Sequence, residues 1–356
     1  MRRKNLHGNT LRWLTAGAIA LIAGSQAGAT THAPDITSEA AGLHWISTYR
    51  ARPEPSQVPT VMRALSKIGA FNEPEKCNAY VGFLAGVIGS HPAEAPNLIS
   101  ETLAMRSRDR WIVVRAIAYS GLPNWKQLLG DVAYRMPERH FMIEKYLTDQ
   151  LPTLDRLAIK PIPTGFERFR SHFKFGLSSG KKRPKDVLEA SPEVLDTLWG
   201  YYFATGSYGP VMQMIAMLGW SANKDDADKL TIGSMAKFTL ASNATHDQAL
   251  LDMLRSSSKA RNQPKATVVA LDEITEAAET VDVASIRKQA LAAIADLQRK
   301  GPAYKRDVSW WGYIGQSAIA GGCLAAAVVS LTAAGLPCVI GGSSASAAMN
   351  FWANQP

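Results

Sequence analysis

Helical periodicity is the feature that most constrains how this chain folds. Apolar residues recur at spacings of three and four along most of it, as Val58, Val61, Leu65 and Ile68 do in VPTVMRALSKIGAF. Proline or glycine stands at the ends of most such runs, where helices stop and turn. Runs that alternate apolar and polar residues are too short to predict strands. The pattern predicts an all-α fold.

Glycines at helix ends indicate how the helices are joined. VVRAIAYSGLPNWKQLLGDVA and LWGYYFATGSYGPVMQMIAML share one layout, in which an apolar helix ends at Gly121 or Gly206 and a second apolar helix follows. A looser version surrounds Gly69. These glycines lie 52 and then 85 residues apart, so no standard repeat period fits. We expect an irregular α-solenoid of stacked helical hairpins, packed as in TPR or HEAT proteins but without a fixed repeat.

The first 29 residues have the parts of a secretory signal peptide. A basic start, MRRK, precedes a short apolar run from Leu14 to Gly24 and the small-residue pattern Ala27-Gly28-Ala29. The apolar run is too short to span a bilayer comfortably. We expect cleavage near Ala29 and export to the periplasm or cell envelope. Cleavage would remove four basic residues and lower the net charge from +9 to +5.

Composition divides the rest of the chain. The predicted regions are a loose, proline-containing lead-in (30–57), a helical hairpin region (58–158), a basic aromatic linker or loop (159–190), a second helical region (191–307) and an uncharged apolar segment (308–356). Within them, a short helix is expected around Trp45. Ser191 and Pro192 are expected to begin a helix as its N-cap and first residue. The last long helical pattern is expected to break near 281–283.

Residues 160–185 are strongly basic. Eight lysines and arginines stand against one acidic residue, Glu167, and phenylalanines are interleaved with them. This mixture suits an anionic lipid surface, whereas the simpler interpretation is a solvated loop whose phenylalanines pack back onto the helices. Nucleic acid is excluded as a partner because an exported chain does not meet it. The candidate residues for anionic-surface binding are Arg168, Phe169, Arg170, Phe173, Lys174, Lys181, Lys182 and Arg183.

Residues 308–356 carry no charge, and Ile314 to Ile340 is long enough to cross a bilayer. Aromatic residues flank this stretch, and small residues within it would let helices approach closely. The residues that suggest a membrane segment are Trp310, Trp311, Tyr313, Gly315, Gly322 and Ala326.

Other properties oppose a simple anchor. Alanine and glycine gain little from entering lipid, and Gly335-Leu336-Pro337 should kink or end the helix. The positive charges before the segment favour the cytoplasm, although export would send that side outward. Three interpretations remain: a buried or interfacial Ala/Gly-rich hairpin, a membrane anchor, or a hairpin that inserts conditionally.

The chain has three cysteines, so at least one thiol lacks an intramolecular partner. Cys323 and Cys338 lie on either side of the Gly335-Leu336-Pro337 break. A disulfide between them would close a hairpin, and export would permit it. Equally, both can serve as small apolar residues.

Sequence motifs for catalysis, metal binding or nucleotide binding are weak. The histidines are scattered without HxxxH or HExxH, and no CxxC pair occurs. Asp226 and Asp228 have the alternate spacing of a calcium loop, but Leu230 occupies the third ligand position. GLSSGKK has the wrong spacing for a phosphate loop. We therefore expect no metal, nucleotide or other cofactor, and the balance leans against an enzyme.

The YSGLP turn and the LWGYYFATG helix end resemble those of a family of uncharacterised bacterial secreted helical proteins. The similarity covers about Val58 to Ala260. These motifs are structural turns, so the resemblance implies an exported all-helical fold and no assigned activity.

The sequence thus predicts a non-enzymatic, exported helical scaffold or interaction protein at the bacterial cell envelope. Its C-terminal segment would associate with membrane, and its partner would be membrane lipid or an envelope protein. The first alternative is a membrane-active protein whose C-terminal hairpin inserts and permeabilises. The second is an envelope hydrolase that uses carboxylates distant in sequence.

Overall fold

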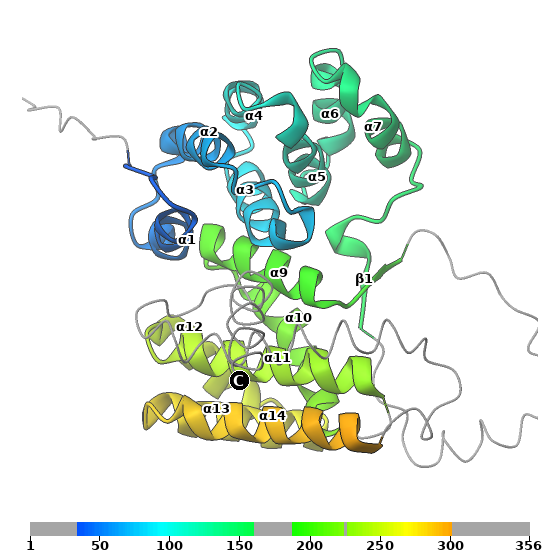
Figure 1. The fold of residues 1–356 in the computed structure, drawn as a ribbon. Helices are drawn as coiled ribbons and strands as arrows, with labels where there is room; N and C mark the ends of the chain where they lie inside the picture. Colours follow the sequence, from blue (N-terminus) through cyan, green and yellow to red (C-terminus); the bar gives the residue numbers. More distant parts are fainter. Residues whose placement is uncertain (1–33, 160–186, 224–225, 301–356) are drawn as a thin grey trace, which may run out of the picture. The chain divides into compact units, whose positions relative to one another are not determined.

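The computed structural model describes residues 34–159, 187–223 and 226–300 (Figure 1). Over these residues it contains thirteen α-helices and two strands of two residues each, which confirms the all-α prediction. The helices before residue 159 are α1 (Glu39–Thr48), α2 (Val58–Ile68), α3 (Asn78–Ser90), α4 (Ala95–Thr102), α5 (Trp111–Tyr119), α6 (Trp125–Ala133) and α7 (His140–Leu147). Those after residue 187 are α9 (Pro192–Thr205), α10 (Tyr208–Leu218), α11 (Ala227–Ala244), α12 (Gln248–Ser258), α13 (Lys265–Glu279) and α14 (Val283–Lys300).

Short 3₁₀ helices precede several α-helices. They are η1 (Tyr49–Ala51), η2 (Pro55–Gln57), η3 (Pro74–Lys76), η4 (Ser107–Asp109), η5 (Pro137–Arg139), η6 (Leu154–Arg156) and η7 (Gly219–Ala222). The strands β1 (Leu157–Ala158) and β2 (Leu188–Glu189) pair in parallel, with Leu157 opposite Leu188. This pairing brings together the two chain ends that flank residues 160–186.

Local chemistry sets several helix ends as the sequence predicted. Gly69, Gly121 and Gly206 all have positive φ, at 90°, 74° and 63°, and stand just after α2, α5 and α9. At the other end of α9, the Ser191 hydroxyl accepts the Val194 N–H at 3.3 Å, and Pro192 is the first helical residue. The chain also breaks between α13 and α14, at the expected place.

Helix α3 lies at the centre of the packing. Its residues 78–88 are all buried, in agreement with a sequence that is apolar on every side. It packs against α9, α5 and α4 (Figure 1). The predicted lead-in also joins this core, because Leu43 and Ile46 of α1 are buried and α1 packs on α9.

Glycines allow α3 and α9 to touch through their backbones. A Cβ placed on Gly82 would lie 1.9 Å from the Thr197 carbonyl oxygen, and one on Gly200 would lie 2.0 Å from that of Ala79. Neither distance is sterically possible. The two helices can therefore approach this closely only because both positions lack a side chain.

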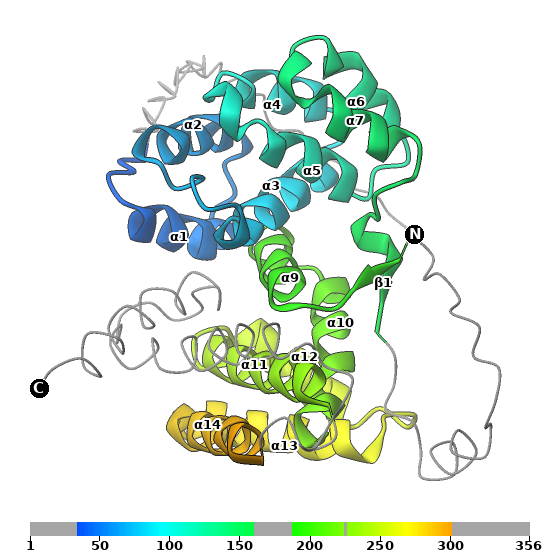
Figure 2. The same ribbon diagram turned by 45° about the vertical axis from the view of Figure 1, so that its right-hand side comes forward.

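The helices after α9 form a second packed group (Figure 2). Helix α11 packs against α10, α13 and α14, and α12 packs against α13. A buried hydrogen bond connects this group to α9, since the Trp199 indole Nε1 donates to Thr239 Oγ1 on α11 at 3.0 Å.

A valine occupies a strained position after α13. Val281 has φ of 56°, in the left-handed region, and its side chain is 72% exposed. The Asp282 N–H donates to the Ala277 carbonyl at 3.0 Å, the bond that closes a Schellman motif. Glycine is the usual residue at this position because a β-branched side chain crowds the backbone there.

The close approach at Gly82 makes a stability prediction. Gly82→Ala should lower the free energy of unfolding by about 3 kcal/mol, because α3 and α9 must move apart. Gly130→Ala is the matched control, since its Cβ would meet nothing within 4 Å in the middle of α6. That variant should gain about 0.5–1 kcal/mol from helix propensity. Urea denaturation measures both changes in the free energy of unfolding. Equal changes in the two variants would contradict the close backbone contact at Gly82.

The strain at Val281 makes a second prediction. Val281→Gly should raise the free energy of unfolding by about 1 kcal/mol. Val269→Gly is the same chemical change at a 48% exposed position inside α13, and it should cost about 1 kcal/mol instead. The thermal midpoint should rise for Val281→Gly and fall for Val269→Gly. A loss of stability in both variants would refute the strain at Val281.

Candidate functional site

The sites predicted from sequence lie outside the residues that the structure describes. This holds for the signal peptide, for the basic residues and phenylalanines of 160–185, for Cys323 and Cys338, and for the membrane segment that starts at Trp310. All of these stay predictions. Among the described helices, none is both long and apolar enough to cross a bilayer.

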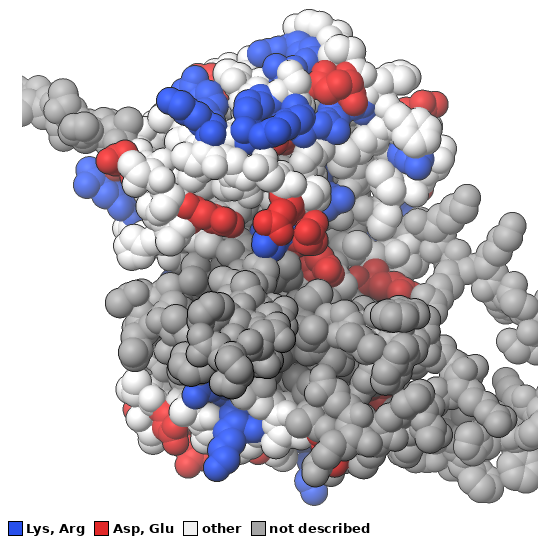
Figure 3. Space-filling model, viewed as in Figure 1, with Lys and Arg blue, Asp and Glu red and all other residues white. Residues whose placement is uncertain are grey.

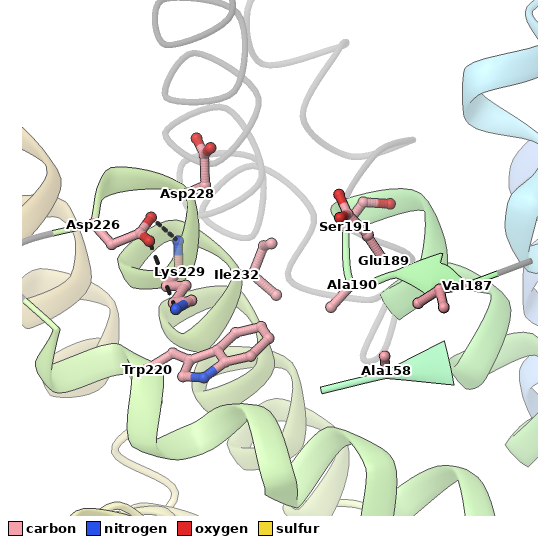
Figure 4. A pocket seen from close by; sticks show the side chains of 10 residues that line it. All are labelled: Ala158, Val187, Glu189, Ala190, Ser191, Trp220, Asp226, Asp228, Lys229 and Ile232. Carbon is pink, nitrogen blue, oxygen red and sulfur yellow. Dashed lines mark hydrogen bonds and ion pairs between the residues drawn. The ribbon is translucent and has the colours of Figure 1, made fainter. Parts of the chain in front are cut away.

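A hollow of about 390 Å³ lies where the strand pair meets the start of α11 (Figure 4). Its polar lining comes from two segments that are separate in sequence. Those residues are Glu189, Ser191, Asp226, Asp228 and Lys229, and Trp220 and Ile232 contribute apolar surface. Three carboxylates thus share one hollow, the kind of arrangement that a hydrolase hypothesis requires.

Two of its polar groups have clear structural roles. Asp226 is the N-cap of α11: its Oδ1 accepts the Lys229 N–H at 3.2 Å, and its Oδ2 lies 3.8 Å from the Lys229 ammonium. Figure 4 shows both contacts as dashed lines. Ser191 caps α9 in the same way. Helix caps explain why these side chains point where they do, so the hollow gives no specific support to catalysis.

A second hollow, of about 470 Å³, lies beside the turn between α11 and α12 and the end of α13. It brings His246 near Asp247 and Glu279. Glu279 accepts two hydrogen bonds from the Arg255 guanidinium, at 2.8 and 3.0 Å. The Asp247 Oδ1 caps α12 by accepting the Leu250 N–H at 3.1 Å. Both carboxylates are therefore held by structural partners.

Asp247 also belongs to a three-residue polar cluster. The Tyr202 hydroxyl donates to Asp247 Oδ2 at 2.6 Å and accepts from Arg50 Nη1 at 2.5 Å. Arg50 Nη2 forms an ion pair with the same carboxylate. Burial and the bond to Asp247 raise the pKa of Tyr202, so its hydroxyl stays protonated at neutral pH. The cluster joins η1, α9 and α12, which are distant in the chain.

Arginines in the turns of the N-terminal helices form a feature that sequence reasoning missed. Arg110 donates to the carbonyls of Leu103 and Arg135, at 3.0 and 2.9 Å. Arg135 in turn donates to Ser100 Oγ at 2.6 Å. These guanidinium groups occupy carbonyls that helix ends leave without partners. The runs MRSRDR and YRMPER, each close to the end of a predicted helix, were the available signal.

Cys77 is a free, fully buried thiol, and its Sγ lies 3.1 Å from the Glu73 carbonyl oxygen. Burial raises its pKa to about 12, so the thiolate is scarce at neutral pH. No group of three or more His, Cys, Asp or Glu residues suited to a metal occurs within the described ranges.

Comparisons with known proteins identify no relative of this chain. No family model matches the chain, and neither a curated protein nor a solved structure matches it significantly. The resemblance based on YSGLP and FATG therefore stays a prediction.

The polar cluster predicts different effects for two adjacent tyrosines. Tyr202→Phe should destabilise the chain by about 2 kcal/mol, because Asp247 and Arg50 lose a buried partner. Tyr201→Phe removes only a neutral bond, from its hydroxyl to the Ser120 carbonyl at 3.2 Å, and should cost about 1 kcal/mol or less. Urea denaturation compares the pair, and a Tyr202 effect no larger than that of Tyr201 would contradict the role of the cluster.

Proposed function

We propose that this chain is a non-enzymatic helical scaffold or interaction protein, exported to the cell envelope of a bacterium. Its body is an irregular solenoid of stacked helical hairpins, and residues 308–356 associate with membrane. The partner is membrane lipid or an envelope protein.

The observation that carries the scaffold proposal is a recurring unit in the N-terminal helices. In α2–α3, α4–α5 and α6–α7, a helix is followed by a short turn, a 3₁₀ helix and a second helix. Neighbouring units pack on one another through α2 with α4, α3 with α5, and α5 with α6 and α7. Stacked units of this kind present extended surfaces, which is how solenoid proteins bind partners.

Export and membrane association rest on sequence. The basic start, short apolar run and small-residue pattern of 1–29 support export. The uncharged stretch with flanking aromatics supports a lipid contact near the C-terminus. The carboxylates of the two hollows that have described partners serve as caps or in ion pairs, and for that reason the scaffold is preferred over the hydrolase.

Cell fractionation tests this proposal. The full-length chain should stay with membranes after an alkaline wash, whereas a version ending at Arg306 should become soluble. If both are soluble, the C-terminal segment does not anchor the protein. Dye release from anionic vesicles by the purified chain would instead support the membrane-active alternative.

The alkaline wash needs a parallel wash in neutral high salt. Burial raises the pKa of Tyr49 from 10.0 to about 12. The folded state keeps this group neutral, so the stability it contributes is complete below pH 10 and declines as the pH rises toward 12. Unfolding of the helical body would change its partition for reasons unrelated to anchoring.

A further inference from the structure

The turns of the three N-terminal hairpins lie side by side. Arg108 in the α4–α5 turn donates from Nη2 to Asn72 Oδ1 in the α2–α3 turn, at 2.9 Å. Arg139, between α6 and α7, donates to the Ser107 carbonyl at 3.4 Å and also to that of Arg108. Hydrogen bonds therefore connect all three turns along one edge of the molecule.

Positive charge is exposed along this edge. The Arg108 side chain is 61% exposed, and Lys67 at the end of α2 is exposed as well. Figure 3 shows lysines and arginines gathered over this part of the surface, with fewer carboxylates between them. Asp109 is buried and already paired with neighbouring arginines, and Glu138 lies 3.4 Å from Arg110.

Large apolar side chains are exposed beside the same turns. Tyr134 at the end of α6 is 81% exposed, and Phe141 at the start of α7 is 69% exposed. Ile68, next to Lys67, is 42% exposed. The Lys145 ammonium lies 4.3 Å from the centre of the Phe141 ring. Leaving these side chains in water costs free energy, which a partner surface would recover.

We propose that this edge binds the surface of an anionic lipid bilayer. We call it the turn edge, formed by Lys67, Ile68, Arg108, Tyr134, Arg139 and Phe141. Lys67 and the exposed Arg108 guanidinium would meet lipid phosphates, while the aromatic rings enter the interface. Arg139 would hold the turns together through its bonds to the Ser107 and Arg108 carbonyls. The inference rests on the proposed envelope location, but it is independent of residues 308–356.

Vesicle binding by the full chain tests the turn edge. Co-sedimentation is measured with vesicles of phosphatidylcholine, with and without phosphatidylglycerol, at low and high salt. Two double variants separate the contributions: Lys67→Gln with Arg108→Gln removes charge, and Tyr134→Ser with Phe141→Ser removes the rings. Each should weaken partition onto the anionic vesicles on the order of tenfold, and high salt should abolish the effect of the charge variant.

Control variants come from the exposed α12–α13 turn and the first turns of α13. Arg261→Gln with Lys265→Gln removes the same charge, and Val269→Ser removes an exposed apolar side chain. Neither should change partition by more than about twofold. Circular dichroism checks that every variant remains folded.

Three results would overturn the proposal. They are no binding of the parent chain to anionic vesicles, unchanged binding of both turn-edge variants, or equal losses in the controls. In a further outcome, the turn-edge variants bind as well as the parent chain while truncation at Arg306 abolishes binding. That result would refute the turn edge alone and leave the proposed membrane association of residues 308–356 standing. Binding that survives both the turn-edge substitutions and the truncation at Arg306 would refute the turn edge and point to another basic segment.

Discussion

Helices α3 and α9 touch through their backbones, and this contact sets the position of every helix packed around them. Gly82 and Gly200 leave no room for a side chain, so each helix rests against a carbonyl of the other. Protein surrounds residues 78–88 of α3, which are largely apolar, and α9 in turn carries residues that reach the later helices. Separating the two helices would open the core at its centre.

Polar contacts then orient the helix groups that hydrophobic burial brings together. From α9, Trp199 reaches Thr239, and Tyr202 joins Arg50 to Asp247. Burial alone is non-directional, whereas these bonds have defined geometry and would be left unsatisfied if the helices shifted. The same logic applies to the turn arginines, whose guanidinium groups occupy carbonyls of neighbouring turns. The proposal of a lipid surface rests on the exposed Arg108, whose turn is hydrogen-bonded through Arg139 to the turn that Tyr134 and Phe141 flank.

The two hollows show how helix caps and ion pairs bring ionisable groups together. Asp226 and Asp247 both begin helices, and a carboxylate is favoured there because it accepts N–H groups at the positive end of the helix dipole. Where two helix starts or ends meet, acidic and basic side chains gather for structural reasons.

Local sequence patterns were enough to predict the all-helical class and several helix ends. Gly69, Gly121 and Gly206, and the Ser191-Pro192 pair, act on the backbone next to them, so local chemistry was sufficient to predict them. The central place of α3, the ion pair of Arg50 with Asp247 and the hydrogen bonds between the N-terminal turns are visible only in the folded chain. Those arrangements join residues far apart in the chain, and periodicity carries no information about which helix faces which.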